Sequence, residues 1–408
     1  MRKRIILTVT GTDKPGVTAA LTRIISESRC SLLDIKQVVV EDQLILAFLI
    51  EFGASDSSQD VLKDLLFKAK EFGLDLDFHV SEEDSKEDEN SRPAYVISVL
   101  AREVHASGLS LVAQVAAEHD FNIERINRLS EKNPFCVEFR VGFSKTVLKE
   151  DFPKKFHEFK TKLLAKASVE DGVDVAIQPD DLFRRAKRLV VLDMDSTLIQ
   201  GEVIDELAHL KGVEKEVSEV TKKAMRGEMQ FEESLRKRVA LLKGLEVSCF
   251  EKVMDGIRLT DGATELIRVL KKLGLKIAVI SGGFTPITLA LKERLGLDYA
   301  YANDLEVMNG VLTGGILGSI ITPQRKADLM DVIAQQEGIA LEQVIAIGDG
   351  ANDLLMLDRA GMGIAFNAKP IVKEKVEHSI DSLGLDSILY LMGINERDVH
   401  QVLGSSSR

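Results

Sequence analysis

The C-terminal half of the chain alternates short apolar strands with helical segments, and this alternation limits the fold more than any other feature of the sequence. The apolar runs are "RLVVLD" from Arg188, "KIAVIS" from Lys276, "QVIAIGD" from Gln343 and "GMGIAF" from Gly361. Such alternation predicts a doubly wound, Rossmann-like α/β fold with a parallel sheet. In a sheet of this kind, ligands bind beyond the carboxyl ends of the strands. Asp193, Ser281 and Asp349 each stand where an apolar run ends, so we expect them to share an active site.

Four carboxylates are predicted to converge at that edge. Asp193 and Asp195 are two residues apart on an extended segment, and so point the same way. Asp349 and Asp353 are four apart where a glycine turn enters a helix, which puts both on one helix face. Crowded carboxylates repel one another unless a positive charge offsets them. An oxygen-only site of this kind favours Mg²⁺.

The N-terminal half contains one small unit twice. "TDKPGVTAALTRIISESRCSLLDI" from Thr12 aligns with "VHASGLSLVAQVAAEHDFNIERI" from Val104, at an offset of 92 residues. Each copy shows the β-α-β-β-α-β order of an α+β, ferredoxin-like domain. We place these domains at residues 1–81 and 94–178, joined by an acidic linker at 82–93.

The second boundary lies near residues 178–188, after which the pattern changes to apolar strands that alternate with helices. We place the α/β domain at residues 186–393, with a helical cap at about 203–254 and a flexible tail at 394–408. A cap over the carboxyl ends of the strands would limit the access of water and help to select the substrate.

Composition excludes several classes of protein. The 408 residues have a formal net charge of -12, which argues against a nucleic acid partner. The apolar runs fall short of the ~20 residues that span a bilayer, so we expect a soluble, cytoplasmic protein with no membrane partner. Cys30, Cys136 and Cys249 are far apart, a pattern typical of buried reduced thiols rather than of a disulfide framework or a zinc site.

Four motifs resemble, in order, those of the haloacid dehalogenase-like phosphatases. They are "DMDSTL" from Asp193, "ISGG" from Ile280, Lys326, and "GDGAND" from Gly348. The resemblance implies that Asp193 attacks phosphorus to form an aspartyl-phosphate and that Asp195 moves the proton. It also implies that Ser281 and Lys326 hold the phosphoryl oxygens.

The same resemblance implies the metal ligands. Asp193, the backbone carbonyl of Asp195, and Asp349 would bind Mg²⁺. Asp353 would orient these ligands from just outside the metal's coordination sphere.

The cap segment closely resembles that of the phosphoserine phosphatases. The matching stretches are "GEVIDELA" from Gly201 and "MRGEMQFEESLRKRVALLKGL" from Met225. The resemblance implies that Glu202 and Arg238 bind the amino acid end of the substrate and that Met225 and Phe231 line an apolar wall. It adds Gly282, Gly283 and Asn352 to the substrate-binding residues.

The implied activity is Mg²⁺-dependent hydrolysis of O-phospho-L-serine to L-serine and phosphate, the last step of serine biosynthesis. One acid and one guanidinium suit the ammonium and the carboxylate of this substrate. Two structural alternatives stay open: Glu202 could cap the helix that follows it, and Arg238 could pair with a helix-face acid such as Glu233. The same chemistry could also act on another small phosphorylated amino acid or alcohol, such as phosphothreonine or homoserine phosphate.

Each N-terminal repeat resembles an ACT domain, a module that often binds an amino acid. In the first copy, Asp13 and Gly16 lie in a turn before a helix whose N-terminus could take a carboxylate. The second copy retains Gly108 but has His105, Ala106 and Ser107 in place of Asp13, Lys14 and Pro15. The resemblance implies a homodimer and a serine effector, although both copies could serve for dimerisation alone.

A reading from a different class is an amino acid sensor with a catalytically dead C-terminal half. The presence of Asp193, Asp195, Lys326 and Asp349 disfavours it, because a dead site has no need of mutually repelling acids.

Overall fold

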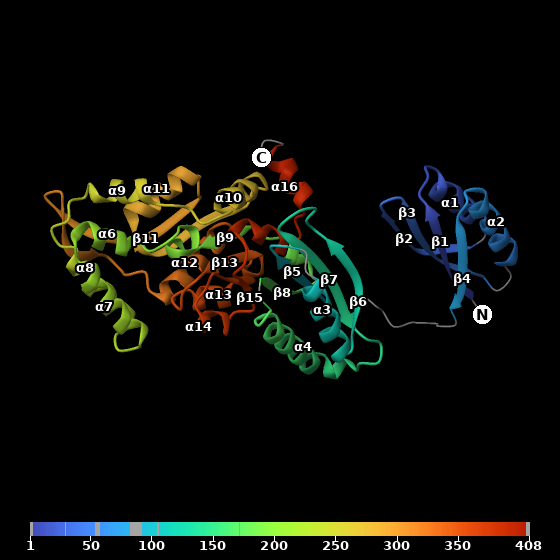
Figure 1. Cartoon of the computed structure of the whole chain (residues 1–408), viewed down its shortest axis with the longest axis horizontal. Helices are drawn as coiled ribbons and strands as arrows, with labels where there is room; N and C mark the ends of the chain where they lie inside the picture. The colour runs from blue at the N-terminus through green and yellow to red at the C-terminus, as the bar shows by residue number, and fades with distance from the viewer. Residues whose placement is uncertain are drawn as a thin grey trace. The chain divides into compact units, whose positions relative to one another are not determined.

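The computed structural model describes residues 3–28, 30–53, 58–81, 92–103, 106–170 and 172–404. The chain divides into two compact units, residues 1–91 and residues 92–408 (Figure 1). Most of the predicted acidic linker, residues 82–91, lies outside the described residues.

The first unit, in its described residues, is a four-stranded sheet backed by two helices. Its order is β1 (Lys3–Thr12), α1 (Val17–Glu27), β2 (Ser31–Val40), β3 (Gln43–Phe52), α2 (Ser58–Glu71) and β4 (Asp75–Ser81). The antiparallel sheet has the order β2-β3-β1-β4. Alternate residues of β1, such as Ile5 and Leu7, share one core with Leu21 of α1 and Leu65 of α2, so both helices cover the same face. The predicted ferredoxin-like fold is confirmed.

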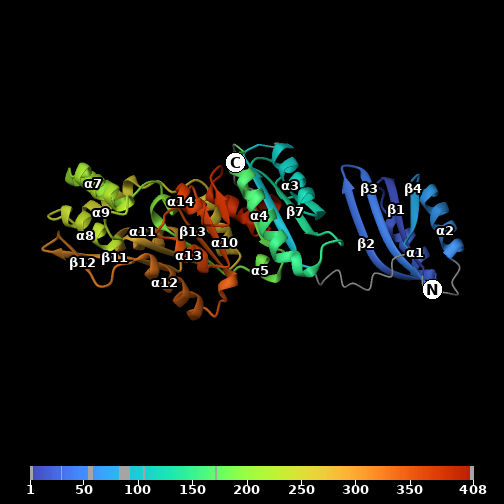
Figure 2. The same cartoon turned by 90° about the horizontal axis from the view of Figure 1, so that it is seen from below.

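The second repeat has the same order within the second unit. It contains β5 (Ala94–Ala101), α3 (Ala106–Glu118), β6 (Phe121–Arg128), β7 (Phe135–Phe143), α4 (Phe152–Ala167) and β8 (Val173–Pro179). Its sheet order, β6-β7-β5-β8, matches that of the first repeat. The helices α3 and α4 cover one face of this sheet (Figure 2). From the other face, Leu100, Cys136 and Ala176 join the core of the α/β domain.

Hydrogen bonds fasten the second repeat to the α/β domain. The carboxylate of Asp174, on β8, accepts from the backbone N–H groups of Asp381 at 3.1 Å and Ser382 at 3.0 Å. Gln178 Nε2 donates to the carbonyl of Leu391 at 3.0 Å. Hydrogen bonds between buried groups require a fixed geometry, so the second repeat and the α/β domain pack as one compact unit.

The α/β domain is built on a sheet with the order β12-β11-β10-β9-β13-β14-β15. The strands are β9 (Leu189–Leu192), β10 (Lys276–Phe284), β11 (Tyr299–Met308), β12 (Val311–Leu317), β13 (Val344–Gly348), β14 (Met362–Phe366) and β15 (His378–Ile380). Neighbouring strands are parallel except for β12, which runs antiparallel to β11.

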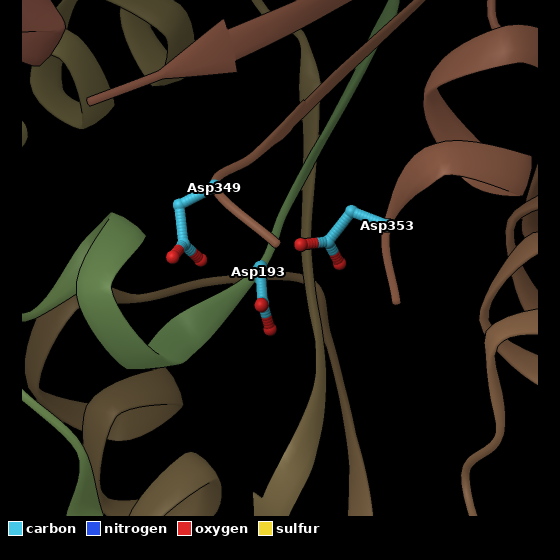
Figure 3. A group of neighbouring side chains, drawn as sticks. All are labelled: Asp193, Asp349 and Asp353. Carbon is cyan, nitrogen blue, oxygen red and sulfur yellow. The ribbon is translucent and has the colours of Figure 1, made fainter. Parts of the chain in front are cut away.

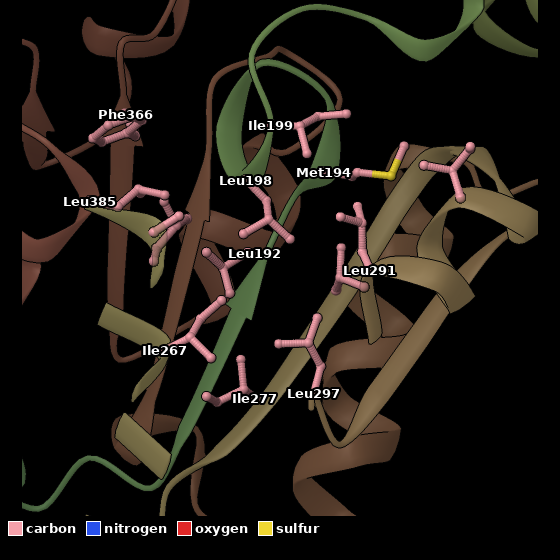
Figure 4. Packing of buried hydrophobic residues seen from close by; sticks show 14 of the residues in the cluster. Leu192, Met194, Leu198, Ile199, Ile267, Ile277, Leu291, Leu297, Phe366 and Leu385 are labelled. Carbon is pink, nitrogen blue, oxygen red and sulfur yellow. The ribbon is translucent and has the colours of Figure 1, made fainter. Parts of the chain in front are cut away.

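Helices cover both faces of this sheet. On one face, Leu192 and Ile277 pack with α10 (Ala263–Lys272) and α11 (Thr285–Leu295), as Figure 4 shows. On the other face, Val191 and Ile280 pack with α12 (Pro323–Gln336) and α13 (Leu354–Arg359). The predicted doubly wound fold is therefore confirmed, and β9 lies at its centre.

The segment predicted to be a cap is helical. It contains α6 (Val203–Lys211), α7 (Glu214–Met225), α8 (Phe231–Leu241) and α9 (Cys249–Gly256). Leu207 of α6 and Leu235 of α8 are buried in the larger of the two cores of the α/β domain, which fixes the cap helices to the sheet.

The C-terminal segment differs from the prediction of a flexible tail. Residues Glu396–Leu403 form the helix α16, whose N-terminus is capped by the side chain of Asn395. Val399, Val402 and Leu403 pack against the core of the α/β domain. Their spacing of three and four residues forms an apolar helix face, a signal that the polar composition of "NERDVHQVLG" obscured.

No helix within the described residues is long and apolar enough to cross a membrane.

Asp174 should make the stability of the second unit depend on pH. Burial raises its pKa to about 6, although hydrogen bonds from Ser382 and Asp381 oppose the rise. In the unfolded chain this pKa is about 3.9. The stability that protonation contributes is therefore present below about pH 4 and is lost as the pH rises through about 6.

The comparison is with Asp174→Asn, which stays neutral. On going from pH 7 to pH 5, the free energy of unfolding of the wild-type chain should rise relative to the variant by roughly 1 kcal/mol. Thermal unfolding of both chains at the two pH values measures this change. A difference in unfolding temperature that is the same at both pH values would contradict the prediction.

Candidate active site

Asp193 is the residue at which the chain leaves the central strand β9. Its side chain accepts a hydrogen bond at 2.7 Å from the backbone N–H of Met194, which begins a short helical turn, Met194–Leu198. Within this turn Ser196 has a φ of +58°. This left-handed conformation costs a non-glycine residue about 1 kcal/mol or more. The strained turn brings Asp195 to the same edge of the sheet as Asp193.

Asp349 and Asp353 come from the neighbouring strand β13 and the turn that follows it. One carboxylate oxygen from each of Asp193, Asp349 and Asp353 lies within 4.8 Å of the other two (Figure 3). Gly348 permits this approach, because a Cβ atom there would lie 2.5 Å from Cγ of Asp353. Three of the four carboxylates predicted to converge therefore form one cluster in the folded chain.

Lys326, from the first turns of α12, supplies the positive charge that the crowded acids require. Its Nζ atom lies 2.7 Å from Oδ1 of Asp193 and 2.7 Å from Oδ1 of Asp353. The side chains of Lys326 and Asp353 are fully buried. Asp353 also accepts from the backbone N–H of Gly350 at 3.0 Å through Oδ2, so both of its oxygens are already bonded.

One lysine does not balance the charge of three carboxylates, and their burial affects the pKa values of the group. Burial raises the pKa of Asp193, and the neighbouring Asp353 adds to the rise, while Lys326 opposes it. Burial also raises the pKa of Asp349 to about 6. Burial alone would lower the pKa of Lys326, but Asp193 and Asp353 outweigh it and raise that pKa. The all-oxygen donors and the uncompensated negative charge both fit a hard divalent cation such as Mg²⁺.

Asp195 sits beside this cluster with both oxygens held. Oδ1 accepts from the backbone N–H of Val203 at 2.8 Å, and Oδ2 accepts from Oγ of Ser281 at 3.2 Å. Burial raises its pKa to about 7, and the charge of Glu202 adds to this rise. Gly283 is required for this packing, since a Cβ there would lie 2.8 Å from Oδ2 of Asp195.

A cavity of about 420 Å³ lies between this edge of the sheet and the cap helices. Of the residues that the sequence analysis assigned to substrate, metal or catalysis, those that line it are Asp193, Asp195, Glu202, Phe231, Arg238, Gly282, Gly283, Asp349 and Asn352. Ser281, Lys326 and Asp353 are buried behind this wall and contact it. Met225 ends α7, and its side chain lies outside the described part of the chain.

The described residues show neither of the two structural alternatives, a helix cap by Glu202 or an ion pair between Arg238 and Glu233. Glu202 precedes α6, but its side chain makes no capping hydrogen bond. Glu233 pairs with Lys237 at 2.7 Å rather than with Arg238. Instead, the Arg238 guanidinium lies in the field of Glu202, Asp205 and Asp195. Both residues therefore stay available at the cavity.

The structure adds cavity residues that the sequence analysis missed. Asp205 and Ser234 line the cavity from the cap, and Lys369 lines it from the loop after β14. The backbone N–H of Lys369 donates to the carbonyl of Asp349 at 3.2 Å. Ser234 could have been found from its spacing, because it precedes Arg238 by four residues on one helix and so shares its face.

The predicted effector residues have different environments in the two repeats. Gly16 has a φ of +93° and directly precedes α1, as expected for a turn into a helix. Gly108 lies inside α3, where a Cβ would approach Cγ1 of Val99 to 3.0 Å and Cγ1 of Val173 to 3.3 Å. It serves close packing rather than an open turn, so the prediction that Gly108 contributes to an effector site is not supported by its environment. His105 lies outside the described residues.

The matches to known families follow the three sheets of the structure. Residues 187–361 match the haloacid dehalogenase-like hydrolases. Residues 3–79 and 93–178 each match an ACT domain. A solved structure of a haloacid dehalogenase family hydrolase from Salmonella enterica has a TM-score of 0.62 at 31% identity, with 73% of this chain and 98% of that chain covered.

Two relatives match almost end to end. A phosphoserine phosphatase of Streptomyces coelicolor is 41% identical, with 97% of this chain and 93% of the relative covered. A phosphoserine phosphatase of Mycobacterium tuberculosis is 37% identical, with 97% of this chain and 94% of the relative covered. Identity at this level over nearly the full length shows that the chain belongs to the phosphoserine phosphatase family.

Proposed function

We propose that this chain hydrolyses O-phospho-L-serine to L-serine and phosphate, in a Mg²⁺-dependent reaction with an aspartyl-phosphate intermediate. The observation that carries the proposal is the buried Lys326, which contacts both Asp193 and Asp353 beside a cavity that Asp193, Glu202 and Arg238 line. A nucleophile for phosphorus and groups for an amino acid would then share one cavity.

Asp193, Asp349 and the backbone carbonyl of Asp195 would hold the Mg²⁺ ion. Asp353 would orient them, since its two oxygens already bond to Lys326 and Gly350. When bound, the ion supplies positive charge that offsets the carboxylates and the phosphoryl oxygens.

In the first half-reaction, a carboxylate oxygen of Asp193 attacks phosphorus. A bond from Asp193 to phosphorus forms while the bond from phosphorus to the serine oxygen breaks. Asp195 gives its proton to the leaving oxygen. Burial raises the pKa of this carboxyl, which is the direction that a proton donor near neutral pH requires.

In the second half-reaction, the ionised Asp195 takes a proton from a water molecule whose oxygen attacks phosphorus. The bond between Asp193 and phosphorus breaks, and phosphate leaves. Ser281 and Lys326 would hold the phosphoryl oxygens through both steps. Each carboxylate returns to its starting state, so the cycle balances.

The amino acid end of the substrate would lie toward the cap. Glu202 would bind the ammonium and Arg238 the carboxylate, with Phe231 and Met225 on the apolar wall. The same chemistry on phosphothreonine or homoserine phosphate is the competing activity. The place of the reaction as the last step of serine biosynthesis and its cytoplasmic location stay predictions.

We also propose that the chain is a homodimer joined through β2 of the first ACT-like unit. Strand β2 is an edge of its sheet and is exposed along its length. Its large exposed apolar residues are Leu32, Leu33, Ile35, Val38, Val39 and Val40. A long apolar edge strand favours pairing with another strand.

A serine effector would bind in the same unit. The turn with Asp13 and Gly16 precedes the free N-terminus of α1, where backbone N–H groups can bind a carboxylate. We restrict this proposal to the first repeat because Gly108 is packed inside a helix.

Phosphate release tests the proposed activity. The wild-type chain should release phosphate from O-phospho-L-serine only with Mg²⁺, and Asp193→Asn should lower kcat by roughly a thousand-fold or more, because the amide is not a nucleophile. The matched control is Asp328→Asn, at a surface acid that pairs with Arg359; it should retain wild-type activity. Release from other esters but not from phosphoserine would keep the chemistry and refute the substrate. No release from any phosphate ester would favour an amino acid sensor.

Sedimentation equilibrium tests the dimer. The wild-type chain should have twice the 45.0 kDa mass of one chain. Val38→Lys should weaken the dimer by roughly ten-fold or more, because a lysine on an edge strand opposes strand pairing. Ile126→Lys, on the matching edge strand β6 of the second repeat, is the control and should leave the mass unchanged. A monomeric wild-type chain, or a dimer that both variants retain, would contradict the proposal.

Isothermal titration and inhibition kinetics test the effector. Serine at the first ACT-like unit should give measurable heat at millimolar concentration and should change the rate even at saturating phosphoserine. Product bound at the active site would instead compete with the substrate. Absence of heat together with an unchanged rate would exclude the effector, and purely competitive inhibition would assign serine to the active site alone.

A further inference from the structure

Ser234 is a buried hydroxyl of the cavity wall that has no hydrogen-bond partner. The residue is 1% exposed, and its Oγ bonds to no other group in the described part of the chain. Leaving a buried hydroxyl unpaired is unfavourable, so such a group in a folded protein requires an explanation. Serine is also a poorer helix former than alanine in the middle of a helix. Neither helix propensity nor internal bonding therefore accounts for Ser234.

The position of Ser234 relates it to Arg238. Phe231, Ser234, Leu235 and Arg238 all line the cavity from α8. Their spacing of three and four residues puts them on one face of the helix. Ser234 and Arg238 are one turn apart, a separation of roughly 6 Å between Cβ atoms. A carboxylate that accepts from Arg238 would therefore lie within about one helical turn of Ser234.

Arg238 shows the same deficiency as Ser234. Its buried Nε atom has no hydrogen-bond partner among the described residues. Three acids, Glu202, Asp205 and Asp195, act on its charge, but none of them forms an ion pair with it within 4.0 Å in the part of the chain that the structure describes. Two unpaired donors on one helix face, one of them cationic, form a site for an anion.

We infer that Ser234 is a further substrate-binding residue, whose hydroxyl donates to the carboxylate of the amino acid substrate beside the Arg238 guanidinium. The inference rests on the proposed function, because it assigns one end of that substrate. Glu202 and Asp205, with their negative charge, are left to the ammonium group. A hydroxyl and a guanidinium thus select the carboxylate end by donating, whereas the two acids select the ammonium end by accepting.

The test compares two substrates that differ only in the carboxylate. O-phospho-L-serine has it and O-phosphoethanolamine lacks it, while both have the phosphate and the ammonium. Ser234→Ala should lower kcat/KM for phosphoserine roughly 10- to 100-fold, the effect of one hydrogen bond to a charged group. For phosphoethanolamine, the variant should change kcat/KM less than two-fold. Where turnover of phosphoethanolamine is slow, its competitive inhibition constant is measured instead.

Thr221 offers a matched control. It lines the same cavity, but its hydroxyl already donates to the carbonyl of Val217 at 3.0 Å. Thr221→Val should therefore change kcat/KM for both substrates by the same factor. Ser234→Ala should also leave the thermal unfolding midpoint unchanged or higher, because it removes an unpaired buried hydroxyl. Equal losses of kcat/KM for the two substrates, with or without a lower unfolding midpoint, would overturn the inference. No loss of kcat/KM for phosphoserine would also overturn it.

Phosphothreonine separates this inference from the proposed function. If the wild-type chain hydrolyses phosphothreonine but not phosphoserine, the proposed function fails. A kcat/KM for phosphothreonine that Ser234→Ala lowers roughly 10- to 100-fold would still support the inference, because phosphothreonine bears the same carboxylate. No hydrolysis of any carboxylate-bearing ester by the wild-type chain would overturn both.

Discussion

The contact of Lys326 with Asp193 and Asp353 is the interaction on which the rest of the site depends. Buried carboxylates at this separation repel one another strongly, and the ends of β9 and β13 hold them there. The lysine lies between two of them at 2.7 Å and makes their proximity tolerable. Removing one partner of a buried pair leaves an uncompensated charge that costs roughly 3–5 kcal/mol. The arrangement still leaves excess negative charge, which keeps the edge of the sheet suited to a divalent cation.

The sequence predicts this edge of the sheet well because the signals are local. Asp193 and Asp349 stand directly after apolar runs, and the parallel topology then brings strand ends together without further information. The signals for Ser234 and Asp205 are weaker. The spacing of Ser234 from Arg238 indicates a shared helix face, but only the tertiary packing decides which face turns to the cavity. The helix α16 was not predicted for a related reason. Its apolar residues are few, and they stabilise the helix only by packing against a core that the sequence does not show.

The contacts between the second repeat and the α/β domain show the same limit. Asp174 accepts from two backbone N–H groups more than 200 positions away in the chain, and no periodicity predicts a partner at that separation. Cys136, expected to be a buried thiol, is buried, but it belongs to the core of the α/β domain rather than to the core under the helices of its own repeat. The repeats thus have one topology and two uses. In the first, the edge strand β2 is exposed and apolar; in the second, the sheet face that bears Leu100 is covered by the α/β domain.

The charge of the cavity bears on the choice of substrate as much as any single contact does. Its walls contain more acids than bases, namely Asp193, Asp195, Glu202, Asp205 and Asp349 against Arg238 and Lys369. In the proposed function, a bound cation and Lys326 offset the acids at the sheet edge. Arg238 carries one positive charge against the two negative charges of Glu202 and Asp205, so an ammonium group on the ligand would balance the second acid. A phosphorylated amino acid brings such a group, whereas a simple phosphate ester adds only negative charge. In the proposed function, the cavity would therefore select its substrate partly by repelling esters that lack an ammonium.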